Sequence, residues 1–534
     1  MAATRMSARA WLWSALSGLI GGAAFLAAAE LVALLVARGA SPVLAVGSFI
    51  VDVVPQPLKE FAIATFGEAD KLVLLIGIGL AVAIAAALAG VLQYVRAPLG
   101  VAAFVLAGIL ATAATVTRAG ATVLSALPPV VGTIAGAVML MLLVNRLRRW
   151  LNPDRALQAS PTDTSSSATD EPASADARGV DRRGFFRFGA IAGVSAVIVG
   201  VGARAISAAT SSLGAIREEL ALPEPGSTVT IPEGAEFDID GLSPLITPNE
   251  DFYRVDTALT VPTVDPATWR LVIDGMVDER IEMSFDDLLA MGVDEYAVTL
   301  TCVSNEVGGG LVGNAVWLGV PIRDVLARAG VQDGADMVLS RSVDGYTAST
   351  PLASLTDDGL DAIFAVGMNG EPLPVEHGFP VRMVVPGLYG YVSATKWVTE
   401  LKVTTFAEDE AYWTPRGYSA KAPIKFSSRV DTPRTGTPVP AGTVPIAGMA
   451  WAQTVGIERV EVSIDDGEWQ QATLSTPIND DTWVQWYLEW EAEPGTHYVA
   501  VRAVNADGDL QIEERAPIAP DGSSGWQRVL VTVE

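Results

Sequence analysis

The sequence has 534 residues, a length that allows roughly three to four domains of about 150 residues each. Half of the residues are hydrophobic and only 18% are charged, which excludes an intrinsically disordered chain and indicates membrane-spanning segments. The single cysteine excludes an internal disulfide, a CxxC zinc site and an iron–sulfur cluster. The two histidines both lie in the C-terminal half, which excludes a histidine-rich metal centre and a bis-histidine haem in the membrane part.

The net charge of −26 is unevenly distributed along the chain. Residues 1–220 hold 17 Lys and Arg against 13 Asp and Glu, a balance of +4, whereas residues 221–534 hold 18 against 48, a balance of −30. Nucleic-acid affinity depends on the neutralisation of phosphates by basic side chains. We therefore expect no nucleic-acid partner for the C-terminal part.

Four apolar stretches are long enough to cross a bilayer, which takes about 20 residues. They lie at about 11–36, 72–92, 98–117 and 122–144. Together they predict a four-span transmembrane domain over residues 1–150. The apolar segment 41–55 is too short to span because Asp52 and Pro55 interrupt it, and it is better interpreted as interfacial or re-entrant.

Basic residues in short loops stay on the cytoplasmic side of a membrane. Arg5 and Arg9 precede the first span, and a cluster of arginines at 146–149 follows the fourth. We therefore predict a multi-pass protein of the cell membrane with both ends of its four-span domain in the cytoplasm. Residues 151–181 are rich in Ser, Thr, Ala, Asp and Pro and have no apolar periodicity, which predicts a disordered cytoplasmic linker.

Residues 182–210 have the form of a twin-arginine export signal, with two adjacent arginines followed by the apolar run 188–202. The alternative is an ordinary fifth span with basic flanks. Both interpretations place the rest of the chain on the extracytoplasmic side, and the first makes the twin-arginine export machinery a partner. Ala203-Arg204-Ala205 resembles a small-residue cleavage site, so release by cleavage is an alternative to a retained anchor.

Short β-rich runs and Gly/Pro turns dominate the sequence after this segment. Ser284–Met291 and Pro321–Ala329 are predicted to be short helices, because each begins near a capping or N1-type residue. This mixture predicts an α+β domain over residues 225–415. From about Tyr418 onward, short alternating strands separated by turns predict an immunoglobulin-like β-sandwich over residues 416–534.

The chemistry depends on the only thiol, Cys302, where a predicted strand enters a glycine-rich loop. A lone cysteine is usually a small buried hydrophobe. A second segment, 374–397, gathers His377, Arg382 and Lys396 at Gly/Pro turns in a region that is otherwise strongly acidic. Together with Ala315-Val-Trp317-Leu-Gly-Val-Pro321, these two segments resemble the sulfite oxidase family of molybdenum enzymes.

The resemblance covers about residues 235–534 and implies a molybdopterin-binding catalytic domain, followed by a sandwich like the family's dimerisation domain. A homodimer is therefore a possible assembly. The fold class implied for the chain is an N-terminal α-helical membrane bundle, then the α+β sulfite-oxidase-type domain, then the all-β sandwich. Dimerisation follows from the resemblance alone.

The resemblance also implies a cofactor and a reaction. Cys302 would be the protein thiolate on the metal of a molybdenum–molybdopterin cofactor, because a soft thiolate suits a high-valent metal. The reaction would be a two-electron oxygen-atom transfer with a small-molecule oxygen-atom donor or acceptor. No haem or iron–sulfur cluster is expected, so a separate partner, a cytochrome or a quinone, would carry the electrons.

Five residues correspond by position to cofactor contacts in the family's motifs: His377, Arg382, Ala394, Thr395 and Lys396. Asn249 matches a cofactor-binding loop of the family less closely, because the spacing is slightly different. Arg382, Lys396 and the backbone N–H groups of Gly387 and Gly390 could bind the cofactor phosphate. The alternatives are that the two basic side chains pair with surface carboxylates and that Asn249 is only a turn residue.

The substrate side departs from the family pattern. Tyr346 corresponds to the family's active-site tyrosine, which could donate a hydrogen bond to the oxo group or the substrate, although a strand tyrosine in the core is the alternative. Sulfite-oxidising members place arginines after the ligand cysteine and an Arg-Asn-His run in an earlier loop, whereas this chain has Glu306-Val307 and Val255-Asp256-Thr257. An acidic pocket should repel sulfite, unless Arg254 or Arg341 points inward. Reduction of an S- or N-oxide is also compatible with the resemblance.

Three other functions remain open from the sequence. Cys302 and His377 could form a hydrolase of the thiol type, although no third orienting residue can be named. A non-enzymatic envelope scaffold could use the sandwich as its binding module, and the four spans could form a channel or transporter. Each of these would give a purified protein without molybdenum.

Overall fold

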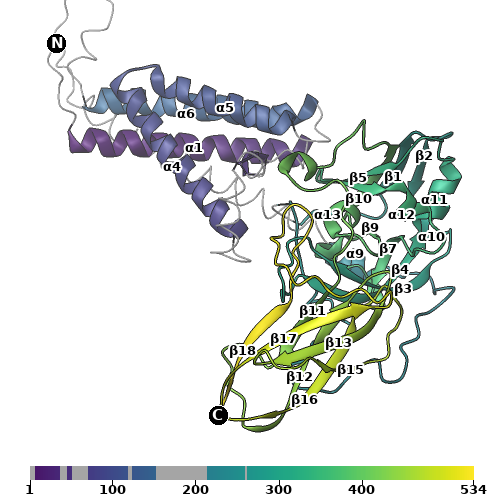
Figure 1. Ribbon diagram of the computed structural model, residues 1–534. Coiled ribbons are helices and arrows are strands. Elements are labelled where there is room, and N and C mark those ends of the chain that lie inside the picture. Colours follow the sequence, from purple (N-terminus) through teal and green to yellow (C-terminus); the bar gives the residue numbers. More distant parts are fainter. Residues whose placement is uncertain are drawn as a thin grey trace, which may run out of the picture. The chain divides into compact units, whose positions relative to one another are not determined.

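The computed structural model describes residues 7–36, 45–47, 49–50, 54, 70–117, 123–151, 213–258 and 261–534. The chain divides into two compact units, Met1–Ser212 and Leu213–Glu534, which are described separately (Figure 1). Apart from its first residue, the predicted linker 151–181 lies outside the described residues, as does the predicted signal or anchor 182–210. The predicted interfacial segment 41–55 is described at only a few helical positions and one bend. These predictions therefore stay predictions.

The first unit consists of helices in its described part. They are α1 (Ala8–Val36), α4 (Asp70–Val95), α5 (Leu99–Val116) and α6 (Leu127–Leu151), with the 3-10 turn η3 (Val123–Ala126) directly before α6. Among the described residues, four helical stretches are long and apolar enough to cross a membrane. They follow the four predicted spans in order, while the multi-pass topology and its sidedness stay predictions.

Helices α1 and α4 pack closely because glycine faces the partner backbone on each side. A Cβ atom at Gly18 would overlap the carbonyl oxygen of Ala86, and one at Gly90 would overlap that of Ser14. Small residues of this kind let apolar helices approach in lipid, where the hydrophobic effect does not drive helix association. Arg148 of α6 donates to the carbonyl oxygen of Tyr94 at 2.8 Å, and so satisfies an end carbonyl of α4.

The second unit begins with a mixed α+β region. Its first sheet has the order β2-β1-β10-β5-β6, and only the pair β1–β10 is parallel. These strands are β1 (Arg270–Gly275), β2 (Ile281–Ser284), β5 (Met337–Ser342), β6 (Thr347–Pro351) and β10 (Val398–Thr404). The second sheet has the order β3-β4-β7-β8, with β9 also paired to β7. Its strands are β3 (Asp294–Thr301), β4 (Val312–Pro321), β7 (Ile363–Met368), β8 (Glu371–Pro372) and β9 (Arg382–Val384).

Short helices connect the strands of this unit. They are α9 (Leu213–Glu219), α10 (Phe285–Leu289), α11 (Ile322–Ala329), α12 (Leu352–Thr356), α13 (Gly390–Ser393), η5 (Val375–His377) and η6 (Thr414–Arg416). The two helices predicted from the sequence are confirmed as α10 and α11. Helix α10 begins with a capping box, in which Ser284 and Asp287 bond each other's backbone N–H. Helix α11 buries one apolar face and ends at Gly330, whose left-handed conformation suits glycine.

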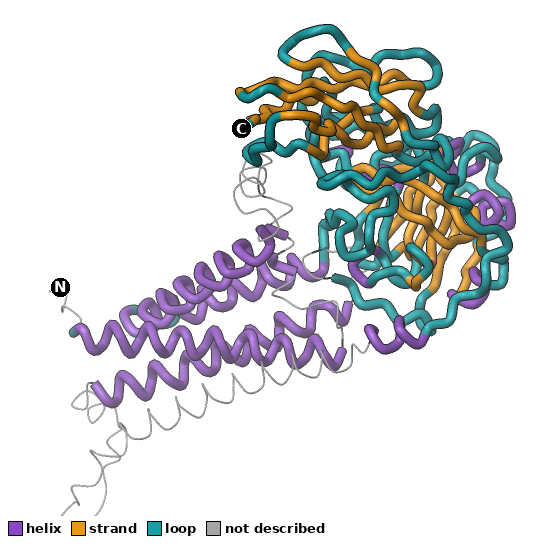
Figure 2. Tube along the Cα trace, turned by 90° about the horizontal axis from the view of Figure 1, so that it is seen from below, coloured by secondary structure: helices purple, strands orange, loops and turns teal. Residues whose placement is uncertain are grey.

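The C-terminal region is rich in β-strands, as the alternation predicts (Figure 2). One antiparallel sheet contains β11 (Ser427–Thr432), β12 (Gly442–Trp451), β16 (Val484–Ala492) and β15 (Thr473–Leu474). The other contains β14 (Gln470–Gln471), β13 (Ile457–Ile464), β17 (Gly495–Asn505) and β18 (Gln527–Val533). The two sheets share one apolar core.

The β-rich region supports strand β3, which leads to the thiol. The amide of Thr299 donates to the carbonyl oxygen of Asp481 at 3.0 Å, and the Thr299 hydroxyl accepts from the amide of Trp483 at 2.9 Å. Gln453 also donates its side-chain amide to the Thr299 carbonyl oxygen. Since Thr299 lies three residues before Cys302, these bonds fix the direction in which the chain enters the site.

Candidate active site

A cavity of about 150 Å³ lies in the second unit and is lined by twenty residues from several elements. The loop after β3, the turn between β5 and β6, η5, α13 and the loop after β10 all contribute to its wall. Cys302 is among the lining residues. The cavity therefore gathers side chains that lie more than 160 positions apart in the sequence, from Phe252 to Tyr418.

The backbone holds the Cys302 thiol at the wall of this cavity. The Cys302 amide donates to the carbonyl oxygen of Leu311 at 2.9 Å, and the Ser304 amide donates to the Cys302 Sγ at 3.4 Å. Burial raises the pKa of the thiol, while the hydrogen bonds from Ser304 and the charge of Lys396 oppose that shift. A metal ion at this sulfur would bind the thiolate and would lower the pKa strongly.

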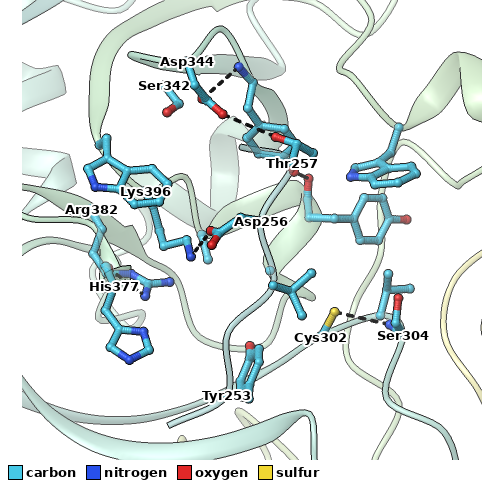
Figure 3. Close-up of a pocket in the computed structure, with 18 of the residues that line it drawn as sticks. Tyr253, Asp256, Thr257, Cys302, Ser304, Ser342, Asp344, His377, Arg382 and Lys396 are labelled. Carbon is cyan, nitrogen blue, oxygen red and sulfur yellow. Dashed lines mark hydrogen bonds and ion pairs between the residues drawn. The ribbon is translucent and has the colours of Figure 1, made fainter. Parts of the chain in front are cut away.

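Three basic groups line the opposite side of the cavity from Cys302 (Figure 3). The buried Arg382 guanidinium donates to the carbonyl oxygen of His377 at 3.1 Å and lies 5.1 Å from the centre of the Trp317 ring. Burial lowers the pKa of Arg382 to about 10 and that of Lys396 to about 8. Burial and these two cations lower the pKa of His377 to about 4, so its imidazole is neutral at pH 7.

Only one of these cations pairs with a carboxylate that lines the cavity. Lys396 forms an ion pair with Asp256, which also accepts a hydrogen bond from Arg254 at 2.7 Å. The Asp256 side chain is fully buried between its two partners. The alternative that Arg382 and Lys396 only pair with surface carboxylates does not describe this arrangement, because Arg382 is buried and the partner of Lys396 is buried as well.

The polar groups of the cavity wall fit a bound molybdopterin. Ser342 is 3% exposed and lines the cavity, and within the described part of the chain its hydroxyl has no hydrogen-bond partner. The hydroxyl of Thr301, directly before Cys302, is buried and also lacks a partner there. Buried hydroxyls rarely stay unpaired in native proteins, so both indicate a missing polar ligand. At Gly390 a Cβ would meet only ordinary contacts, which leaves room for that ligand.

A metal at Cys302 would need ligands from outside the protein. In the described ranges, no group of three or more His, Cys, Asp or Glu side chains could hold a metal ion. A cofactor that brings its own sulfur ligands therefore suits this site better than an ion held by the protein alone. The donor set present, one thiolate opposite buried cations, matches a metal cofactor with an anionic phosphate.

Aromatic rings line a third part of the cavity. Trp413 and Tyr418 have ring centroids 5.2 Å apart, and Tyr391 and Tyr418 have centroids 5.5 Å apart. The Tyr346 hydroxyl donates to the carbonyl oxygen of Tyr391 at 2.7 Å. Its hydrogen is thus used within the protein, and this geometry differs from the expected donation to an oxo group or substrate. Burial and nearby negative groups raise the pKa of Tyr346, so the phenol stays protonated.

Seven of the ten sequence-predicted site residues line the cavity. They are Cys302, Tyr346, His377, Arg382, Gly390, Ala394 and Lys396. Thr395 is fully buried beside it and its hydroxyl lies 2.7 Å from that of Ser340. Asn249 bonds Asn369 and accepts a hydrogen bond from His377 at its carbonyl oxygen, and the Gly387 carbonyl oxygen accepts from the Ile424 amide at 2.9 Å. These three do not line the cavity.

The acidic residues that line the substrate side are only partly those expected from the sequence. Glu306 is exposed and does not line the cavity, and the carboxylates that do so are Asp256 and Asp344. Arg254 forms an ion pair with Asp256, and Arg341 forms one with Glu400 at 3.1 Å. Neither arginine lines the cavity, so neither supplies the cationic pocket that sulfite would need.

Several lining residues were missed in the sequence. They are Tyr253, Ser304, Ser342, Asp344, Tyr391, Trp413 and Tyr418. The density of aromatic residues in Tyr412-Trp413-Thr-Pro-Arg-Gly-Tyr418, directly after the last strand of the α+β region, is a signal that could have found the last two. Tyr253 lies within electrostatic reach of Cys302 and Arg382, and burial raises its pKa, so its phenol also stays protonated.

The geometry does not favour a thiol hydrolase. The Nε2 of His377 lies 3.2 Å from the carbonyl oxygen of Asn249, and no hydrogen bond joins His377 to Cys302 among the described residues. The two residues lie on different sides of the cavity (Figure 3). A nucleophilic cysteine needs a lowered pKa and a neighbouring base, whereas the Cys302 pKa is raised and the His377 imidazole binds a carbonyl.

Comparison with known proteins agrees with this site. Residues 258–413 match the family model of the oxidoreductase molybdopterin binding domain. The chain is 33% identical to mitochondrial sulfite oxidase of Mus musculus over 339 residues, which cover 54% of this chain and 62% of the relative. It is 30% identical to sulfite oxidase of Gallus gallus over 321 residues, which cover 51% of this chain and 69% of the relative.

The sulfane dehydrogenase SoxCD from Paracoccus pantotrophus aligns with a TM-score of 0.48 and 23% identity, and covers 57% of this chain and 90% of that chain. The chain spans less than two thirds of the length of the mouse sulfite oxidase.

The fold and the site thus define a molybdopterin-binding oxidoreductase domain that follows a set of apolar helices and precedes a β-rich region. The chain belongs to the sulfite oxidase family of molybdopterin-dependent oxidoreductases. Its cofactor is the molybdenum cofactor of that family.

Proposed function

We propose that the protein is a membrane-anchored, extracytoplasmic oxidoreductase that transfers an oxygen atom in a two-electron step at molybdenum held by Cys302. The observation that carries this proposal is the placement of the only thiol on one cavity with buried Arg382 and Lys396. The unpartnered hydroxyls of Ser342 and Thr301 on and beside that cavity add polar groups that a pterin could bind.

When bound, the cofactor supplies a metal that exchanges an oxygen atom and two electrons with the substrate. Cys302 would hold this metal through its thiolate, and the Ser304 amide would stabilise the negative sulfur. Arg382 and Lys396 would bind the cofactor's phosphate, since charge-assisted hydrogen bonds to phosphate are the strongest available. Neutral His377 donates through Nε2 to the Asn249 carbonyl oxygen, so its Nδ1 could only accept a hydrogen bond and could orient the cofactor without adding charge.

The protein also prepares the substrate side. The Tyr346 phenol bonds the backbone of α13, and the rings of Tyr391, Trp413 and Tyr418 exclude water from the wall around it. Rigid, packed aromatic side chains hold a small substrate in a fixed orientation at low entropic cost. Electrostatic interactions strengthen in such a site because water is excluded.

The location of the enzyme belongs to the same proposal. Four apolar helices are long enough to anchor the protein, and the arginine pair at 182–183 with its apolar run favours export as a folded, cofactor-loaded domain. A cytochrome or quinone would then exchange electrons with the site. We further propose that the β-rich region is an immunoglobulin-like sandwich, through which two copies could associate.

Elemental analysis of the purified protein tests this function. The protein is produced in a host that makes molybdopterin, and wild type is compared with Cys302→Ser and with the remote, exposed control Thr443→Ser. We expect about one molybdenum per chain in wild type and control, and a changed metal absorption spectrum with lost turnover in Cys302→Ser. Folded wild-type protein without molybdenum would contradict the proposal and favour a non-enzymatic envelope scaffold.

A further inference from the structure

The aromatic part of the cavity carries a carboxylate that lacks a counter-ion. Asp344 accepts a hydrogen bond from the Tyr346 amide at 3.3 Å and lies 3.5 Å from the Thr257 hydroxyl (Figure 3). Within the described ranges no Lys or Arg forms an ion pair with it. The other carboxylate of the cavity, Asp256, is neutralised by Lys396 and Arg254. The uncompensated negative charge therefore lies at Asp344.

The rings beside Asp344 add to this negative potential. Tyr346, Tyr391, Trp413 and Tyr418 come from three separate elements and form a connected aromatic wall. The face of an aromatic ring attracts cations, and cages of Trp and Tyr are the usual binding sites of alkylated ammonium groups. A carboxylate next to such a wall strengthens the attraction for a positive centre and repels an oxoanion.

The cations of this region do not change that balance. Arg341 pairs with Glu400, and Arg416 contacts the Tyr412 ring at 3.7 Å and donates to the Tyr412 carbonyl oxygen. Neither of them lines the cavity. The three basic lining residues, His377, Arg382 and Lys396, belong to the side assigned above to the cofactor.

We propose that the substrate is a tertiary amine N-oxide, a choice that rests on the proposed function. Its nitrogen carries a formal positive charge and its oxygen a formal negative charge. The alkylated nitrogen would lie against Trp413 and Tyr418 near Asp344, and the oxygen would point toward the Cys302 side. Oxoanions such as sulfite lack a positive centre that this wall could bind.

The reaction balances with an external electron donor. The N–O bond breaks, the substrate takes up two electrons and two protons, and the products are the tertiary amine and water. Two molecules of a reduced c-type haem protein, or one quinol, deliver the two electrons, and the two protons come from solvent or from the quinol. The amine becomes protonated and keeps the positive charge that the wall binds.

Calorimetric titration of the molybdenum-loaded enzyme tests the binding preference without turnover. The probes are choline, its uncharged carbon analogue 3,3-dimethylbutan-1-ol, and sulfate. We expect choline to bind about 5- to 30-fold more tightly than the uncharged analogue, the range that a cation near aromatic rings supports. Sulfate should bind more weakly than either. Asp344→Asn should remove most of the preference for choline, and the exposed, remote Asp507→Asn should keep it.

Steady-state kinetics test the same assignment with substrates. Dithionite-reduced methyl viologen supplies electrons to trimethylamine N-oxide or to the uncharged dimethyl sulfoxide. We expect Asp344→Asn to raise the KM for the N-oxide about tenfold and the KM for the sulfoxide much less, and Trp413→Leu to act in the same direction. Asp507→Asn should match wild type.

The outcomes separate the two proposals. Molybdenum and Cys302-dependent turnover without a preference for choline or the N-oxide would overturn the substrate assignment and leave the proposed function standing. Sulfate that competes with choline and binds more tightly would overturn it as well. Absence of molybdenum in folded protein would overturn both.

Discussion

The two sides of the cavity are built from opposite chemistry. The basic side holds the buried His377 and Arg382 together with Lys396, whose side chain is 11% exposed. The substrate side holds Asp344 and a wall of tyrosine and tryptophan rings, and no basic residue of the described chain lines it. Cys302 lines the same cavity, opposite the basic groups (Figure 3).

This difference separates what the family shares from what is particular to this chain. In the proposed function the basic side would bind the cofactor that all members need, which agrees with the presence of its residues in the motifs that carry the resemblance. The substrate side meets a molecule that can change from one member to another. Its charge has changed from the arginine-rich pocket expected of sulfite-oxidising members to a single carboxylate among aromatic rings.

The largest expected effect comes from the only thiol in the sequence, Cys302. Cys302→Ser removes the soft metal ligand, and we expect kcat to fall by roughly three orders of magnitude or more, since ligands of this kind act as one unit with the metal. The melting temperature should change little because the side chains are similar in size. Turnover that persists in the variant would show that the thiol is not the metal ligand.

A substitution on the basic side should lower activity because the protein then retains less cofactor. Arg382→Met removes a buried guanidinium, and we expect cofactor affinity to fall about 10- to 100-fold, as for a lost charge-assisted hydrogen bond. Molybdenum and pterin content after dialysis measure this effect. Arg382→Lys should keep part of the affinity, because lysine preserves the charge but not the planar fork. Full retention in Arg382→Met would remove this residue from the cofactor site.

The substrate side should accept an oxoanion when a cation is returned to it. Val255 lines the cavity and is 48% exposed, so Val255→Arg fits without a packing change. We expect the KM for sulfite to fall about tenfold with ferricyanide as acceptor, and the gain to shrink at high salt. Val343→Arg is a matched control, because Val343 is 47% exposed and does not line the cavity. An equal gain in both variants would mean a general surface effect.

The smallest expected effect is the pH dependence of the basic side. The Lys396 pKa is lowered to about 8 by burial, so the cofactor-free site loses this positive charge as the pH rises from 7 to 9. An anionic phosphate should then bind a few-fold more weakly per pH unit, at most tenfold. Lys396→Arg should keep cofactor retention constant over this range, because arginine stays protonated. A pH-independent wild type would show that Lys396 does not contact the phosphate.

Features that follow from local pattern could be predicted from the sequence. The helices α10 and α11 begin at the capping Ser284 and at Pro321, where a short-range signal sets the helix start. The four apolar helices follow from length and hydrophobicity alone. Cys302, Arg382 and Lys396 were found because each lies in a motif whose order along the chain is itself informative.

Other residues could not be placed by motif alone. Asn249 and Gly387 were expected at the cofactor, yet the Asn249 side chain bonds Asn369, the Gly387 carbonyl oxygen bonds Ile424, and neither residue lines the cavity. Glu306 follows Cys302 by four residues, but it is exposed to solvent and does not line the cavity. A sequence position near a ligand fixes the distance along the chain, and a tight turn within that distance reverses the direction of a side chain.

The sequence by itself determined the order of the parts, the single thiol, the basic segment and hence the family and cofactor. Only the tertiary structure decided which carboxylate is neutralised, because Asp256 meets Lys396 and Arg254 while Asp344 meets tyrosine and threonine. Ion pairing depends on separations of about 4 Å, and the energy of a charge pair falls as that distance grows. Residues separated by more than a hundred positions reach such distances only when strands and loops fold together, so the charge of the substrate side is a property of the fold.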